Sequence, residues 1–432
     1  MEKTFGLKEH GTTVQQEIVA GLTTFLTMAY ILVVNPGMLG EIGNGMTAEA
    51  VFTATAIASA IATLVMAFAA NLPVALAPGM GLNAFFTYAV VFGMGYSWQV
   101  ALTAVFLEGI LFLILSFFNV REAIIKAIPA NLKKAVAVGI GIFISLIGFA
   151  NSGIVVNTSG TILGLGTLTA GSPLLAFLGL IIIIILYTLK IPGAILLGIL
   201  VTTILGIPLG VTTIPAGWSP VGLPAAPLLF QFDFSPATIL SFKFFTVFFT
   251  FLFVDIFDTV GTLVGVTTQA GLIDKNGDIP RVKQALIADA VGTVAGAALG
   301  TSTVTSYVES TAGVAAGGRT GLTSVITAIL FLLALFLSPL FLLIPSAATA
   351  PALIMVGFLM MRPVTAIDFS DPTEGIPAFL AIVMMPFAYS IAEGIVYGVI
   401  SYVLLKLAAG KLREISAVTW VLFVIFLARF FL

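Results

Sequence analysis

Residues 249–268 read FTFLFVDIFDTVGTLVGVTT, an apolar run long enough to span a membrane that carries two aspartates near its middle. Asp255 and Asp258 are three residues apart, so they project from nearly the same face of a helix. A charge at the bilayer centre costs about 2.5–3.5 kcal/mol on insertion scales, so acids there are expected to face a cavity, a partner or a substrate. We interpret this stretch as one wall of a binding site in the middle of the membrane.

A second stretch, GTSTVTSYVESTAGVAAGGRTG (300–321), carries Glu309 and is too irregular to form a complete span. Its first residues are rich in Thr and Ser and predict extended chain, followed by a short half-helix. The stretch LPVALAPGMGLNAFFTYAVVFG (72–93) has the same character, because its prolines and glycines prevent a continuous helix. Two half-helices in corresponding positions indicate a carrier built from inverted repeats.

Composition places the whole chain in a membrane and excludes several kinds of site. Of 432 residues, 59% are hydrophobic and 8% are charged, whereas soluble domains carry about 25% charged residues. The chain has no cysteine, and its one histidine, His10, lies in the polar N-terminal tail, so we expect no metal centre and no cofactor. A net charge of −2 with no basic run beyond Lys133-Lys134 argues against a nucleic-acid partner.

The predicted fold is an all-α polytopic membrane protein with fourteen segments in two inverted seven-helix repeats. Half-helices form segments three and ten, and the other twelve lie near 17–38, 50–70, 98–118, 135–150, 173–189, 193–209, 240–268, 282–299, 322–343, 350–361, 375–388 and 391–408. The predicted divisions are an N-terminal tail (1–16), a first repeat (17–209), an extracellular loop (210–239), a second repeat (240–409) and an apolar tail (410–432). Whether 416–432 spans the membrane stays open.

Basic residues predict the orientation of these segments. With the N-terminus inside, every Lys and Arg except Lys243 and Arg429 falls on the cytoplasmic side. An error of one helix in the count would scramble this pattern. We therefore expect a multi-pass protein of the cell membrane with a cytoplasmic N-terminus.

The two half-helices predict the chemistry of the site. Helix N-termini that end inside a membrane offer backbone N–H groups and a positive dipole end. We expect Asn83 and Glu309 in the first turns, facing Asp255 and Asp258. Such a site suits a neutral heterocycle that has both ring N–H donors and carbonyl acceptors, whereas the acids would repel an anion.

Four motifs carry a family resemblance: TTFLTMAYIL (23–32), APGMGLNAFF (77–86), VDIFDTVGTLVG (254–265) and TSTVTSYVESTAG (301–313). They resemble those of the AzgA-like purine permeases, the guanine, hypoxanthine and adenine carriers of the nucleobase:cation symporter superfamily. The resemblance covers essentially the whole chain and implies a carrier that is not an enzyme. It also implies the fold of the uracil permease, with a core domain (helices 1–4 and 8–11), a gate domain (helices 5–7 and 12–14) and proton symport.

The resemblance also implies roles for individual residues. Acids matching Asp258 and Glu309 grip the base, and the acid matching Asp255 and the amide matching Asn83 are also needed in AzgA-like members. Thr262 stands where the uracil permease has a histidine, which agrees with the purine branch.

The remaining site predictions concern the backbone and the proton. We expect backbone amides near Asn83 and Tyr307 to complete the grip on the base. Asp255, desolvated beside a second acid, is predicted to carry the coupling proton. Glu108, a further acid within a predicted span, either relays protons or bonds structurally to the eighth helix. The expected partners are a purine base, a proton and the lipid bilayer, with a homodimer as an option.

Other readings of the same residues remain. Asp255 and Asp258 could be a structural pair, and Asn83 and Glu309 could only cap their half-helices. An anion carrier of the sulfate or bicarbonate type is the main alternative function, although it would want a basic or neutral residue in place of Glu309. An intramembrane aspartyl protease is disfavoured because its two acids should lie on separate helices. A channel is a third option, but the ordered half-helices and the acid cluster favour a closed site. Coupling to sodium stays open, although the acids favour protons.

Overall fold

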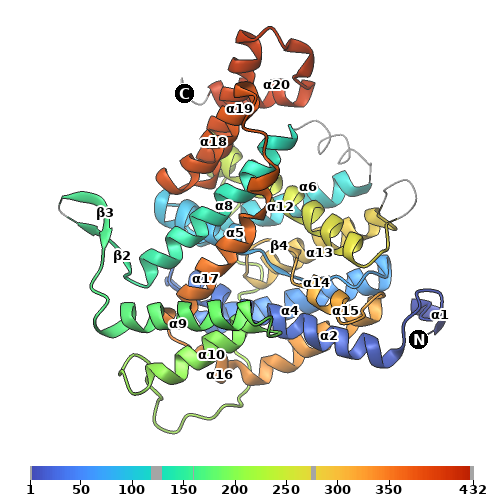
Figure 1. Ribbon diagram of the computed structural model, residues 1–432, viewed down its shortest axis with the longest axis vertical. Helices are drawn as coiled ribbons and strands as arrows, with labels where there is room; N and C mark the ends of the chain where they lie inside the picture. The colour runs from blue at the N-terminus through green and yellow to red at the C-terminus, as the bar shows by residue number, and fades with distance from the viewer. Residues whose placement is uncertain (1, 118–128, 159, 274–278, 429–432) are drawn as a thin grey trace.

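The computed structural model describes residues 2–117, 129–158, 160–273 and 279–428, and helices dominate it (Figure 1). The first half contains α1 (Glu2–Phe5), α2 (Val14–Met28), α3 (Ile31–Gly40), α4 (Ala48–Val65), η1 (Met66–Ala70), β1 (Leu76–Pro78), α5 (Met80–Ala84), η2 (Phe85–Gly93), α6 (Trp98–Phe117), α8 (Ala130–Asn151), β2 (Val155–Thr158), β3 (Thr161–Leu165), α9 (Gly171–Thr188) and α10 (Ala194–Gly206). The second half contains α11 (Pro236–Ile239), α12 (Phe242–Gln269), α13 (Val282–Leu299), β4 (Val304–Ser306), α14 (Ser310–Ala315), α15 (Gly321–Ala334), η3 (Leu335–Leu337), α16 (Ser338–Leu342), α17 (Ser346–Met360), η4 (Arg362–Ala366), α18 (Pro372–Phe387), α19 (Ile391–Ala408), η5 (Leu412–Glu414) and α20 (Ala417–Ala428).

Ten helices in the described part of the chain are long and apolar enough to cross a membrane, which makes this a multi-pass membrane protein. Four shorter apolar helices accompany them: Met80–Gly93, Ala194–Gly206, Pro372–Phe387 and Ala417–Ala428. The spans predicted at 193–209 and 375–388 correspond to two of these shorter helices, α10 and α18. The count of fourteen spans therefore stays a prediction.

The two irregular segments meet inside the molecule as a short antiparallel ladder. Strands β1 and β4 pair with Ala77 opposite Thr305, and both strands are buried. The ladder continues at each end, because Gly79 N donates to Thr303 O (2.9 Å) and Tyr307 N donates to Ala75 O (3.0 Å). Each strand leads into a short helix, α5 or α14, so the expected strand-plus-half-helix is present twice.

Each of these strands is fastened to a neighbouring helix in the same way. The hydroxyl of Thr63 in α4 donates to Leu76 O (3.2 Å) and accepts from Leu76 N (3.0 Å). The hydroxyl of Thr293 in α13 donates to Val304 O (2.9 Å) and accepts from Val304 N (3.2 Å). One threonine thus satisfies both backbone groups of a buried strand residue, which would be costly to leave unpaired.

We call the paired strands β1 and β4, with the starts of α5 and α14, the junction. Helix α12 lies beside the junction and is hydrogen-bonded to it through Thr259. The Thr259 hydroxyl is 2.7 Å from that of Thr305 in β4. Leu252 and Ile256 of α12 pack in a buried cluster with Phe112 of α6 and Ala290 of α13. The face of α12 that carries the acids is therefore fixed relative to β4.

The two chain ends pack on the helices. Phe5 and Leu7 of the N-terminal tail are buried with Leu322 of α15. At the other end, the buried ammonium of Lys406 in α19 contacts Glu374 of α18 (2.8 Å) and Glu414 (2.5 Å), which leads into α20. Figure 1 shows α18, α19 and α20 together at one end of the molecule.

One element of the structure, a β-hairpin, was not among the sequence-based predictions. The hairpin β2–β3, which follows α8, was not anticipated from the polar, glycine-containing stretch that forms it. Three of the basic residues that support the predicted orientation, Arg121, Lys126 and Lys275, lie outside the described residues, as does Arg429, one of its two exceptions.

Candidate functional site

The carboxylate of Glu309 lies directly before α14, at the end of the β1–β4 ladder. Its Oε1 accepts a hydrogen bond of 2.5 Å from the hydroxyl of Tyr30, which lies between α2 and α3. The Thr27 hydroxyl in α2 approaches the backbone oxygen of Glu309 at 3.4 Å. Glu309 also lines a cavity of about 220 Å³. An acid held by one buried donor therefore remains accessible to a small ligand.

The Asn83 side chain is fully buried in α5 and engaged at both ends of its amide. Its oxygen accepts a hydrogen bond from the Ser302 hydroxyl, and its nitrogen donates to Pro78 O (3.4 Å). These bonds tie α5 to the segment that precedes β4. They favour a structural role for this amide in the conformation seen here.

The Tyr307 side chain fastens the same junction from the other strand. Its hydroxyl donates to Pro78 O (2.6 Å), and its own backbone N–H is bound to Ala75 O. The N–H of Asn83 is likewise used within its helix, by Gly79 O (2.8 Å). Backbone amides of these two residues therefore hold the junction together in this structure.

Asp258 and Thr262 lie on the stripe of α12 that passes the junction. Asp258 is partly exposed, and its charge interacts with those of Glu309 and Asp289. Thr262, one turn later, is 8% exposed. The structure thus places Asp258 within electrostatic reach of Glu309, and that these two acids grip a ligand stays a prediction.

Asp255 and Glu108 are both fully buried and lie further back. Asp255 precedes Ile256 in α12, and Glu108 is one turn before Phe112 in α6, so both border the α6–α12–α13 cluster. Neither lines the cavity beside Glu309. Asp258, Asn83, Tyr307 and Thr262 do not line it either, so among the described residues Glu309 is the predicted site residue that this cavity exposes.

Two residues of this neighbourhood were missing from the predicted site. Asp289 of α13 is fully buried and accepts a 2.5 Å hydrogen bond from the Thr259 hydroxyl. Its signal was present, since it is an acid inside the span predicted at 282–299. Tyr30 belongs to a quoted motif, but its contact with Glu309 joins residues 279 positions apart, which no local pattern indicates.

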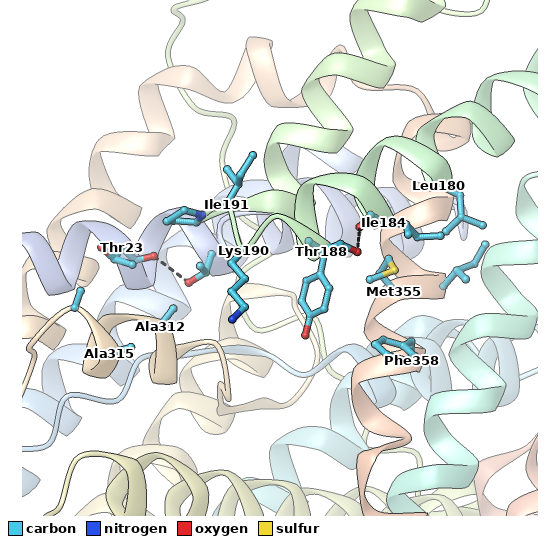
Figure 2. A pocket seen from close by; sticks show the side chains of 15 residues that line it. Thr23, Leu180, Ile184, Thr188, Lys190, Ile191, Ala312, Ala315, Met355 and Phe358 are labelled. Atoms are coloured by element: carbon cyan, nitrogen blue, oxygen red, sulfur yellow. Dashed lines mark hydrogen bonds between the residues drawn. The ribbon is translucent and has the colours of Figure 1, made fainter.

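The small cavity adjoins a larger one of about 1010 Å³, shown in Figure 2. Thr27, Tyr187, Ile191 and Ala312 line both. The larger cavity extends from α2 and α14 to α9 and α17. Together the two spaces connect Glu309 with the end of α9.

Three hydrogen-bonded polar side chains join η2 to the C-terminal ends of α3 and α8. The Tyr88 hydroxyl in η2 donates to Glu41 after α3 (3.0 Å), and Asn151 at the end of α8 donates to the Tyr88 hydroxyl (2.6 Å). By the predicted topology these ends lie on the outer face. The described cavities lie on the other side of the junction.

Comparison with known proteins agrees with this architecture. The model of a family described as the permease family matches residues 15–397. The adenine permease AdeP of Escherichia coli is 45% identical over 99% of this chain and 95% of its own length. The guanine/hypoxanthine permease PbuG of Bacillus subtilis is 45% identical over 100% of this chain and 99% of its own length.

Solved structures share the fold at low sequence identity. The transmembrane domain of the cyanobacterial bicarbonate transporter BicA superposes with a TM-score of 0.65 at 17% identity, over 89% of this chain and 97% of that domain. Murine Solute Carrier 26 family member A9, an anion transporter in an inward-facing state, gives a TM-score of 0.63 at 12% identity, over 91% of this chain and 68% of its own.

Proposed function

This chain belongs to the permease family, and we propose that it takes up purine nucleobases across the cell membrane together with protons. Guanine, hypoxanthine and adenine are the substrate class, in keeping with the names of the relatives that match over their full length. Membership of a permease family makes the chain a transporter and not an enzyme.

The observation that carries the proposal is the position of Glu309. Its carboxylate stands where β1, β4 and α14 meet, lines a cavity and is oriented by Tyr30. A purine presents several ring N–H and exocyclic donors, and a carboxylate can accept two hydrogen bonds in its plane. In the proposed complex, Glu309 accepts from the base and Asp258 accepts from a second donor.

Binding needs a rearrangement of the junction if its amides are to take part. Asn83, Tyr307 and Thr262 remain proposed contacts, yet the first two are bonded within the protein here. The proposed role of Asn83 and Tyr307 is therefore chiefly to hold β1 and β4 in register, so that Glu309 and Asp258 keep their spacing.

Proton coupling is proposed to use the acids behind the junction. Ionised carboxylates are costly in an apolar interior, and several close together repel one another, so a bound proton lowers the free energy of the cluster. Asp255 is our candidate for the coupling proton, with Glu108 as a relay or a structural partner. A membrane potential of 100 mV supplies about 2.3 kcal/mol per charge moved, which corresponds to roughly fiftyfold accumulation.

The proposed architecture is the fourteen-segment inverted repeat with a core and a gate domain. The matching use of Thr63 and Thr293 on two buried strands supports the repeat. The N-terminus is proposed to be cytoplasmic, and transport to proceed by movement of the core against the gate. The group Glu41, Tyr88 and Asn151 would then close the outer side while the cavities open inward.

An anion carrier is the second candidate, favoured only by the shared fold. The structures of similar shape include a bicarbonate transporter, but at 17% identity. The charges of Asp258 and Glu309 at the junction oppose an anionic substrate. We therefore rank it below purine uptake.

Uptake into proteoliposomes tests the proposal directly. Radiolabelled hypoxanthine, guanine, adenine, uracil and bicarbonate are offered with and without an inward proton gradient. Accumulation of a purine that collapses with a protonophore is expected. Purine uptake indifferent to the proton gradient would overturn the coupling, and uptake of bicarbonate alone would overturn the substrate class.

A further inference from the structure

The larger cavity leads to Glu309, yet its lining has a composition that a path for a nucleobase does not by itself require. Most of its lining is apolar and comes from α9, the turn that follows α9, α14 and α17, and it includes Leu180, Ile184, Pro192, Ala315, Met355 and Phe358. Its single charged lining residue is Lys190. A long apolar space with a cation at one end is complementary to an amphiphile that has an anionic head.

Lys190 is held in place by an unusual turn. It lies just past the end of α9 with φ of 58°, in the left-handed region that favours glycine. Its N–H donates to Tyr187 O (2.9 Å) and Ile191 N donates to Leu186 O (3.1 Å), the paired bonds of a Schellman motif. A lysine at a position that favours glycine costs backbone strain, and such outliers point to function.

The turn directs this lysine into the cavity. Figure 2 shows the Lys190 side chain extending between Ala312 and Ala315 of α14 and Phe358 of α17. A second cation, Arg362, lines the adjoining cavity and donates to the Tyr187 hydroxyl (2.7 Å). Ion pairs found among the described residues involve Lys406 and Lys411, so within that part of the chain neither Lys190 nor Arg362 forms one.

The apolar wall of the cavity, formed by α9 and α17, is open to its surroundings. Helix α9 is the least covered of the ten candidate spans, with 22% of its apolar window buried. Ile184 and Phe358 line the cavity and are 45% and 55% exposed, so its apolar wall is accessible to an acyl chain. Lys190 and Arg362 lie on the face where the sequence places the cytoplasmic loops.

We propose that this cavity binds one anionic phospholipid from the cytoplasmic leaflet, with its phosphate at Lys190 and Arg362 and an acyl chain along α9 and α17. Basic pockets between membrane helices on this side recognise anionic head groups. Because the cavity separates α2 and α14 from α9 and α17, the lipid stabilises the conformation in which these pairs are apart. This site is independent of which substrate the carrier transports.

Thermal unfolding of the purified full-length carrier tests the site. Dioleoyl-phosphatidylglycerol, added to the detergent-solubilised protein, is expected to raise the unfolding temperature by several degrees more than dioleoyl-phosphatidylcholine. Lys190→Gly keeps the turn geometry and removes the charge, so phosphatidylglycerol should bind about fivefold more weakly and its advantage should shrink. The variant should unfold no earlier than the wild type in phosphatidylcholine, because the strain is relieved.

Two further variants test separately whether the lipid effect depends on a charge elsewhere in the protein and on the space inside the cavity. Lys8→Gln removes an exposed cation of the N-terminal tail and should keep the full preference for phosphatidylglycerol. Ala315→Phe fills the cavity without changing charge and should weaken the effect of both lipids.

Three outcomes would overturn the lipid assignment. One is equal stabilisation of the wild type by the two lipids, and another is an unchanged preference in Lys190→Gly. The third is protection by inorganic phosphate or adenosine monophosphate that matches phosphatidylglycerol, which would assign the cations to a soluble phosphate compound. Hypoxanthine binding, measured on the same samples by calorimetry, reports separately on the proposed transport function.

Discussion

The hydroxyl of Tyr30 donates a 2.5 Å hydrogen bond to Oε1 of Glu309, across 279 residues of sequence. This contact joins the break between α2 and α3 to the start of α14. It leaves the second carboxylate oxygen to a ligand in the cavity. The site therefore depends on two interrupted helices that are far apart in the chain.

Replacing Tyr30 by phenylalanine should weaken purine transport while the protein stays folded. A hydrogen bond to a charged group contributes about 1.5–3 kcal/mol, so the KM for the purine should rise roughly tenfold or more. Tyr402→Phe is a matched control, because its buried hydroxyl contacts Glu414 O (3.4 Å) away from the site. Equal KM values for the two variants would show that Tyr30 does not position Glu309.

Close packing of α14 on α2 should be equally important. A Cβ on Gly313 would meet Thr24 Oγ1 and would lie 2.7 Å from Ala20 O, so Gly313→Ala should push α14 away and separate Tyr30 from Glu309. Transport should fall at least tenfold. Gly261→Ala in α12 meets no atom within 4 Å and should transport like the wild type. Full uptake by both variants would contradict the prediction that close packing of α14 on α2 is needed for transport.

Replacing either of the two threonines that anchor β1 and β4 should lower the stability of the protein by a similar amount. Thr63→Val and Thr293→Val each remove a hydroxyl that satisfies a buried N–H and a buried C=O. Each should lower the free energy of unfolding by about 1–3 kcal/mol, which thermal unfolding in detergent can rank. A large effect at one position with none at the other would argue against equivalent roles in a repeat.

Asp371, the N-cap residue of α18, should make the stability of the protein depend on pH under acidic conditions. Hydrogen bonding to Lys411, and then to Thr373, lowers the pKa of Asp371 below its ordinary value of 3.8. A lowered folded-state pKa means that its contribution is complete above about pH 4 and is lost as pH falls further. Asp371→Asn should flatten this part of the unfolding-temperature profile. An identical profile in the variant would remove Asp371 as its source.

Local chemistry made much of the fold predictable. Pro73, Pro78 and Gly79 indicate the break that becomes β1 and α5, and the Thr- and Ser-rich run before Glu309 indicates β4. Long apolar runs located most helices to within a few residues. The number of spans was harder, because α10 and α18 are shorter than a bilayer requires and gain their place from tertiary packing.

The site was only partly predictable, because its decisive contacts are tertiary. The acids Asp258 and Glu309 follow from the cost of charge in a membrane, and the same argument would have found Asp289. That Ser302 and Pro78 engage the Asn83 amide, and that Tyr30 holds Glu309, depends on how β1 meets β4. Periodicity within one segment carries no information about such partners.

Purine uptake by a Glu309→Gln variant is the measurement that tests the central claim most directly. Glutamine keeps the size of the side chain but replaces one acceptor oxygen by a donor group, so it cannot bind the ring N–H groups as the carboxylate does. Glu49→Gln, an exposed acid in the first turn of α4, is the control. With both proteins folded to the same extent in proteoliposomes, we predict that hypoxanthine accumulation is lost in Glu309→Gln and kept in Glu49→Gln. Undiminished accumulation in Glu309→Gln would contradict the account.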